Sequence, residues 1–196
     1  IYFTCPFSDI RYIRENTDAI IVTAQAMESL KPGRGMGHLL PEALYEAGAR
    51  ATFLNHAENP MTMAELAKTI ARARELGIET IACADSLAEG TAIAAFHPDI
   101  LLCEPTDLIG TGKTADDSYT TSIVAKIRSI DPTIGIMIAS GITTADDVYR
   151  VVRLGADGSG ATSGILNAPD PAERIMEMAE AIVRAAEARE ATEGAA

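Results

Sequence analysis

Short apolar runs alternate with amphipathic segments along the whole chain, and this alternation predicts strands that are each followed by a helix. Compact runs of Ile, Leu, Val and Ala are typical of buried strands, whereas apolar residues three and four positions apart predict helices. Pro41 opens one predicted helix and Gly77 ends another. The predicted strands are residues 1–5, 19–24, 51–55, 80–84, 100–103, 134–139 and, weakened by its glycines, 156–162. The predicted helices are residues 9–15, a segment beginning at 41, then 63–76, 86–96, 119–130, 145–154 and 171–187.

This order predicts an α/β protein with right-handed βαβ units and a parallel sheet covered on both faces. Seven such units follow one another without a linker or a shift in composition. A doubly wound open sheet and a (β/α) barrel both fit the pattern, although no G-x-G-x-x-G follows the first strand, which disfavours a dinucleotide-binding fold. We expect one domain over residues 1–190 and a frayed, Ala/Glu-rich tail over 191–196.

The composition of the 196 residues, 47% hydrophobic and 22% charged, is that of a globular protein and excludes disordered, collagen-like and coiled-coil classes. Because only 5% of the residues are aromatic, the core must consist mainly of Ala, Ile, Leu, Val and Met. The net charge of −12 argues against nucleic acid or an anionic membrane as the main partner. A small anionic substrate remains possible, since one local site can bind it against the overall charge.

The three cysteines, Cys5, Cys83 and Cys103, predict buried thiols in a reducing cytoplasm, because their number is odd and two of them lie in apolar runs. No apolar run approaches the roughly 20 residues that span a bilayer, and residues 1–6 do not have the pattern of a signal peptide. No pair of His or Cys has the spacing of metal ligands, so we expect no metal.

The residues directly after the predicted strands are the candidate site, because parallel α/β folds bind ligands at the carboxyl ends of their strands. His56 follows the third strand, Glu104 follows the fifth, and loops of Gly, Ser and Thr follow the sixth and the last. Together they suit proton transfer on a small phosphorylated carbonyl compound: a carboxylate takes the proton beside the carbonyl, a hydrogen-bond donor stabilises the enediolate, and backbone N–H groups bind the phosphate.

Each of these residues also has a structural interpretation. A lone histidine such as His56 is more often structural than catalytic, and Gly141, Ser163 and Gly164 also fit ordinary turns. A carboxylate such as Glu104, directly after a buried strand, is costly unless it is paired or functional. The combination of residues, more than any one of them, favours an active site.

Several longer motifs together resemble triosephosphate isomerase of the compact archaeal type. They are LNHAEN at 54–59, CEPTDLIGTG at 103–112, SGITTADDV at 140–148 and ATSG at 161–164. The segment KPGRGMGHLLPEALYEAGA at 31–49 is similar to the dimer-contact loop of that family and its following helix. The resemblance runs in order over almost the whole chain, and the EPxxLIGTG stretch is its most specific part.

The resemblance implies a (β/α)8 TIM barrel and an isomerase of glycolysis and gluconeogenesis that interconverts dihydroxyacetone phosphate and glyceraldehyde 3-phosphate without a cofactor. It further implies a homo-oligomer, dimer or tetramer, through the loop 31–38. By position, Glu104 matches the base and His56 the neutral electrophile. Asn55 and Glu58 match supporting residues, the latter a buried acid. Phosphate-binding positions are matched by Ile109, Gly110, Gly141, Thr162, Ser163 and Gly164.

The chain also departs from the family pattern. Its first strand corresponds to the second strand of the family's barrel, so the Asn-x-Lys motif of the family's first strand has no counterpart, and the chain does not begin with Met. We therefore expect the sequence to be part of a longer chain. If it is not, the alternative is a catalytically impaired phosphate-binding barrel; another alternative is an isomerase of a different short sugar phosphate.

Overall fold

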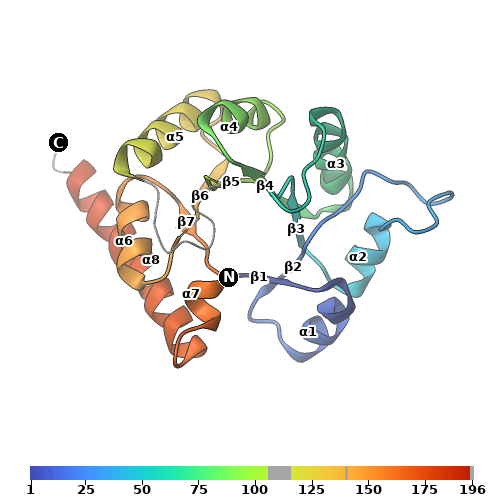
Figure 1. Cartoon of the computed structure of the whole chain (residues 1–196), viewed down its shortest axis with the longest axis horizontal. Coiled ribbons are helices and arrows are strands. Elements are labelled where there is room, and N and C mark those ends of the chain that lie inside the picture. The colour runs from blue at the N-terminus through green and yellow to red at the C-terminus, as the bar shows by residue number, and fades with distance from the viewer. Residues whose placement is uncertain (106–115, 140, 195–196) are drawn as a thin grey trace. The chain divides into compact units, whose positions relative to one another are not determined.

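The structure, a computed structural model, describes residues 1–105, 116–139 and 141–194. The chain divides into two compact units, one made of residues 1–83 and 95–100 and the other of residues 84–94 and 101–196. In both units each strand is followed by at least one helix, as the hydrophobic pattern predicts (Figure 1).

Four parallel strands form the sheet of the first unit in the order in which they occur in the chain. β1 (Tyr2–Cys5) pairs with β2 (Ile21–Ala24), β2 with β3 (Ala51–Leu54), and β3 with β4 (Glu79–Ala84). The parallel pairing of β2 with β3, which are consecutive in the chain, is the one that a (β/α) barrel requires. In doubly wound sheets β1 lies inside the sheet, so that the pairs β2–β3 and β3–β4 do not occur together. The observed pairing therefore excludes the doubly wound alternative.

The helices of the first unit begin and end where local sequence signals place them. They are η1 (Phe7–Asp9), a short 3₁₀ turn that the pattern did not predict, α1 (Ile10–Asn16), α2 (Pro41–Ala47) and α3 (Met63–Leu76). The side chain of Thr62 accepts a hydrogen bond from the N–H of Glu65 and so caps α3, and Gly77 ends it with a φ of 69°. α3 buries Leu66 and Ile70, which are four residues apart and lie on one face.

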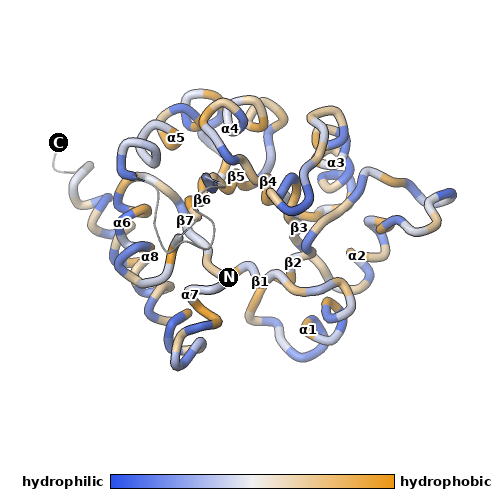
Figure 2. Tube along the Cα trace, viewed as in Figure 1, coloured by the Kyte–Doolittle hydropathy of each residue, from blue (hydrophilic) through white to orange (hydrophobic). Residues whose placement is uncertain are grey.

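The second unit contains the remaining elements. They are α4 (Leu87–Ala94), β5 (Ile100–Cys103, of which Ile100 belongs to the first unit), α5 (Asp117–Ile130), β6 (Gly135–Ile138), α6 (Ala145–Arg153), β7 (Gly158–Ser159), α7 (Ser163–Leu166) and α8 (Pro171–Glu193). β6 and β7 are parallel neighbours, and the N–H of Ala139 donates to the carbonyl of Cys103 at the end of β5 over 3.2 Å. β5 forms an apolar segment in Figure 2, and its residues 101–103 are buried.

α6 and α8 lie side by side in the second unit (Figure 1). α6 buries Val148, Val151 and Val152, and α8 buries small residues such as Ala181 and Ala185. Small side chains let packed helices approach each other closely.

The last strand and the last helix also differ from the sequence prediction. β7 contains only two residues because glycine carries no side chain that packs on a strand face. α8 extends to Glu193, beyond the predicted end at 187, because its last turns consist mostly of Ala, Glu and Arg, which are strong helix formers. In the part of the chain that the structure describes, none of the helices combines the length and the apolar character that crossing a membrane requires.

Candidate functional site

The residues after β3 form a short loop that Asn55 holds in place. Asn55 is buried and has a φ of 57°, a left-handed conformation that asparagine adopts more easily than most residues. Its Nδ2 donates to the carbonyl of Cys83 on β4 over 3.0 Å, and its Oδ1 accepts from the N–H of Met61 over 2.9 Å. These two bonds attach both ends of the loop to the sheet, so the following residue, His56, has a defined position.

The His56 ring is oriented by the backbone of its own loop. The N–H of Glu58 donates to Nδ1 of His56 over 3.2 Å. The carboxylate of Glu58 lies 3.9 Å from the same nitrogen, which is beyond hydrogen-bond range. A nitrogen that accepts a hydrogen bond carries no proton, so this geometry assigns the ring proton to Nε2. This tautomer presents the Nε2–H donor on the far side of the ring.

Glu58 does not occupy the position that the resemblance predicted. Its side chain is 91% exposed, whereas the matching family residue was expected to be buried. A buried carboxylate needs a cationic partner to offset its desolvation, and in water Glu58 needs none. In this structure the backbone N–H of Glu58, and not its carboxylate, makes the hydrogen bond to His56.

Glu104 lies at the carboxyl end of β5, in the second unit. Its N–H donates to the carbonyl of Ala84 over 2.9 Å, so the sheet fixes its backbone. The preceding residue, Cys103, is fully buried, and burial raises the pKa of its thiol to about 12, so the thiol stays protonated at neutral pH. Glu104 is half-buried.

Sequence reasoning missed Tyr119, whose hydroxyl lies near Glu104. Burial raises the pKa of Tyr119, and the nearby Cys103, Asp85 and Glu104 raise it further. The hydroxyl is buried and has no hydrogen-bond partner among the described residues. No sequence signal could have found Tyr119, because it belongs to the first turn of α5 and approaches Glu104 only in the folded unit.

The loop after β6 is a turn that hydrogen bonds with the first turn of α6 keep in place. Gly141 has a φ of 69°, which favours glycine. The carboxylate of Asp147 accepts from the N–H groups of Thr143 and Thr144 over 3.0 and 2.8 Å, and from both of their hydroxyls. With the Thr144 side chain accepting from the N–H of Asp147, this is a complete capping box.

The segment after β7 opens a one-turn helix, α7, where the sequence analysis expects a loop of Gly, Ser and Thr. A Cβ added to Gly164 would lie 2.5 Å from the carbonyl oxygen of Ile142 and 2.7 Å from Cα of Thr143, so only glycine fits. This close approach brings Thr162, Ser163 and Gly164 against the turn after β6. Among the described residues, the N–H groups of Ser163 and Gly164 have no hydrogen-bond partner, so they are available to an anion.

Asp147 predicts a pH-dependent contribution to stability. Burial tends to raise the pKa of Asp147, but the hydrogen bonds from Thr143 and Thr144 outweigh it and hold the pKa below its usual value of 3.8. A carboxyl with a lowered pKa stabilises the folded state above pH 3.8, and this stabilisation is lost as the pH falls through the folded-state pKa. We expect Asp147→Asn to lower the free energy of unfolding by about 1–2 kcal/mol at pH 7.

Urea unfolding of both proteins at pH 7 and again below pH 3.8 measures this effect. The difference between wild type and variant should shrink at the lower pH. A difference that stays constant with pH would show that the carboxylate charge of Asp147 does not stabilise the turn.

Not every predicted site residue can be placed. Ile109 and Gly110 lie outside the described residues. Asn55 and His56 belong to the first unit, whereas Glu104, Gly141 and residues 162–164 belong to the second. Within the described residues, no group of three or more His, Cys, Asp or Glu side chains has the arrangement of a metal site. The absence of a metal and of a cofactor stays a prediction.

Comparison with known proteins identifies the relatives of this chain. The profile of the family described as Triosephosphate isomerase matches residues 1–182. The triosephosphate isomerase of Methanocaldococcus jannaschii is 34% identical over 175 residues, which cover 88% of this chain and 80% of the relative. That of Sulfolobus acidocaldarius is 32% identical over 191 residues, 96% of this chain and 83% of the relative.

A third relative, the triosephosphate isomerase of Methanopyrus kandleri, is 35% identical over 177 residues, or 88% of this chain and 78% of the relative. The match to the family profile covers nearly the whole chain, and the parallel strands follow the chain order that a (β/α)8 barrel requires. The fold class is therefore the TIM barrel, with seven βα units in this sequence. The chain belongs to the triosephosphate isomerase family.

Proposed function

We propose that this chain, an isomerase by its family, interconverts dihydroxyacetone phosphate and glyceraldehyde 3-phosphate with Glu104 as the base and His56 as the electrophile. The observation that carries the proposal is the family match over residues 1–182, within which both residues follow buried parallel strands. The comparisons do not favour the alternatives of an impaired barrel or another sugar phosphate.

In the proposed reaction the Glu104 carboxylate removes a proton from the carbon next to the substrate carbonyl. The electron pair of the broken C–H bond forms the C=C bond of an enediolate, and negative charge moves to the former carbonyl oxygen. Nε2–H of His56 donates a hydrogen bond to that oxygen, which stabilises the charge as it develops. Glu104 then returns the proton to the former carbonyl carbon, where the electron pair of the C=C bond forms the new C–H bond. The hydroxyl on the first carbon gives its proton to the former carbonyl oxygen and becomes the new carbonyl, so the substrate is isomerised without net change in atoms or electrons.

We further propose that Gly141 and residues 162–164 bind the substrate phosphate, together with Ile109 and Gly110. The unpartnered N–H groups of Ser163 and Gly164 support this role, and so does the close packing of the two turns. A phosphate held at a fixed distance from Glu104 would keep the reacting carbons in place during both proton transfers.

The test is an isomerase assay of the whole chain with dihydroxyacetone phosphate in D2O. We expect glyceraldehyde 3-phosphate to appear in a coupled dehydrogenase assay. Deuterium should enter the carbon that receives the proton, because the proton held by Glu104 exchanges with solvent while the enediolate is present. Four-carbon sugar phosphates serve as controls and should not react. The absence of any turnover would contradict the proposed function.

We also propose that the chain self-associates through the loop 31–38. Met36 at its tip is fully exposed, which is unusual for a large apolar side chain. The base of the loop is well anchored: Arg72, itself buried, donates to the carbonyl of Leu30 over 3.0 Å, and Nδ1 of His38 lies 2.8 Å from Glu28. A rigid loop that carries an exposed apolar tip is suited to insertion into a second copy of the chain.

Light scattering at micromolar protein measures this association. We expect a dimer or a larger assembly for the wild type and a smaller mass for Met36→Asp, because a charge at the tip opposes its burial. A monomeric wild type would contradict the proposal.

We propose a cytoplasmic location as well, which the three buried free thiols support because reducing compartments preserve them.

A further inference from the structure

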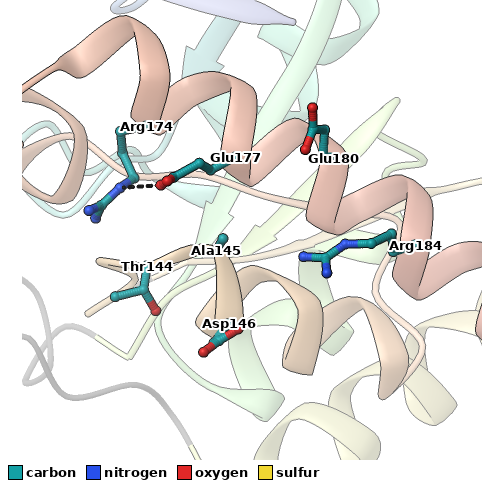
Figure 3. Close-up of a pocket in the computed structure, with 7 residues that line it drawn as sticks. All are labelled: Thr144, Ala145, Asp146, Arg174, Glu177, Glu180 and Arg184. Atoms are coloured by element: carbon teal, nitrogen blue, oxygen red, sulfur yellow. Dashed lines mark hydrogen bonds and ion pairs between the residues drawn. The ribbon is translucent and has the colours of Figure 1, made fainter.

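Arg174, in the first turns of α8, contacts the turn that we assign to phosphate binding. Its Nη1 donates a hydrogen bond to the carbonyl oxygen of Thr143. Its Nε donates to Glu177 on the next turn of α8 over 3.2 Å, and only 24% of the Arg174 side chain is exposed. Figure 3 shows the interaction of Arg174 with Glu177 on the same helix. The guanidinium is therefore oriented by its own helix while it donates to the backbone of the neighbouring loop.

The turn after β6 is thus held from two sides. Asp147 accepts from the N–H groups of Thr143 and Thr144, and Arg174 donates to the carbonyl of Thr143. The carbonyl of the preceding residue, Ile142, lies against Gly164 of α7. A shift of the Thr143 peptide would therefore move both segments of the proposed phosphate site, the Gly141 turn and the first turn of α7.

We propose that Arg174 is a positioning residue that fixes the phosphate-binding turns and thereby sets the affinity for the substrate phosphate. The inference rests on the proposed function of these turns. Arg174 acts through the Thr143 carbonyl, and its role is to keep backbone N–H groups in the places that a phosphate needs. Donors that are already in place cost no reorganisation when the anion binds, so their displacement weakens binding.

An open cavity of about 400 Å³ borders the Arg174 side chain. The first turn of α6 forms one wall and α8 the other (Figure 3). The lining residues are Thr144, Ala145, Asp146, Arg174, Glu177, Glu180 and Arg184. Because the cavity is open to solvent and contains acidic groups, a free guanidinium ion can reach the place that the arginine head occupies.

The test compares Arg174→Ala with wild type in the whole protein. We expect KM for the triose phosphate to rise about tenfold, and inhibition by inorganic phosphate to weaken by a similar factor, while kcat changes less than about threefold. Guanidinium chloride at low, non-denaturing concentration should lower the KM of Arg174→Ala part of the way towards the wild-type value. The ion can bind where the arginine head is missing and donate to the carbonyl of Thr143.

Arg184→Ala is the matched control. Arg184 lines the same cavity, and its guanidinium lies 5.9 Å from the centre of the Tyr149 ring. We expect its KM and phosphate inhibition to equal those of wild type, with no response to guanidinium. If Arg184→Ala shows the same rise in KM and the same response to guanidinium, loss of any arginine from this cavity has the effect. The proposal for Arg174 is then overturned.

A second variant, Arg174→Met, keeps the apolar stem of the side chain and removes only the donors. Arg174→Met should show the same rise in KM. If Arg174→Ala does not fold, Arg174→Met tests whether Arg174 sets the affinity for the substrate phosphate. Unchanged KM and phosphate inhibition in Arg174→Met overturn the role of Arg174 and leave the proposed function intact. A lack of turnover in the unaltered chain contradicts the proposed function itself, so the two failures are distinguishable.

Discussion

Replacement of Glu104 by Gln is expected to lower kcat by about two to four orders of magnitude, the range typical for the loss of a positioned general base. Glutamine has nearly the same size and keeps the backbone hydrogen bond to Ala84, but its amide does not accept a proton from carbon. KM should change little, because the groups that we assign to the phosphate remain in place. Steady-state kinetics with both triose phosphates measures the effect.

Glu187→Gln is the control for this experiment, since Glu187 is an exposed acid on α8. It makes the same chemical change and should retain the activity of wild type. If Glu104→Gln keeps more than a tenth of the wild-type kcat, another group must remove the proton, and the assignment of the base is wrong.

Replacement of His56 by Asn is expected to lower kcat by about two to three orders of magnitude, because the donor that stabilises the enediolate oxygen is lost. The loop itself should stay folded, since Asn55 makes the hydrogen bonds to Cys83 and Met61 that attach it to the sheet. Circular dichroism and urea unfolding check the fold, and the kinetic assay measures kcat.

His97→Asn is the control for His56→Asn. His97 occupies a turn with a φ of 54°, a conformation that asparagine accepts readily, so its replacement should leave both stability and activity unchanged. Exchange of the substrate proton with D2O adds a second measurement. If His56→Asn exchanges and isomerises at the wild-type rate, His56 is a structural residue, as its isolated place in the sequence also allowed.

Much of the secondary structure was determined by the sequence itself, because local signals specify it. Residues 63–76 and 100–103 were predicted with their observed ends, the first through Thr62 and Gly77 and the second through a continuous apolar run. The weakness of the last strand was also predictable, since glycine packs poorly on a strand face wherever it occurs. The positions of His56 and Glu104 after strands follow from the same patterns.

The choice between a doubly wound sheet and a barrel was decided by the pairing of β2 with β3 and of β3 with β4. Hydrophobic periodicity shows that a strand is buried and does not say which strand lies beside it. In the sequence, only the resemblance to a family indicated which strands are neighbours. The strand register of the structure shows the same neighbours independently.

The details of the candidate site depended on tertiary structure. Glu58 was expected to be buried and is exposed, because burial of a carboxylate depends on a partner that one sequence segment does not reveal. Tyr119 and Arg174 each belong to a helix that follows the site residue they act on. The electrostatic interaction of Tyr119 with Glu104 joins residues 15 positions apart, and the hydrogen bond of Arg174 to Thr143 joins residues 31 positions apart. Local sequence determines which helix a side chain belongs to, whereas the packing of that helix determines which loop the side chain contacts.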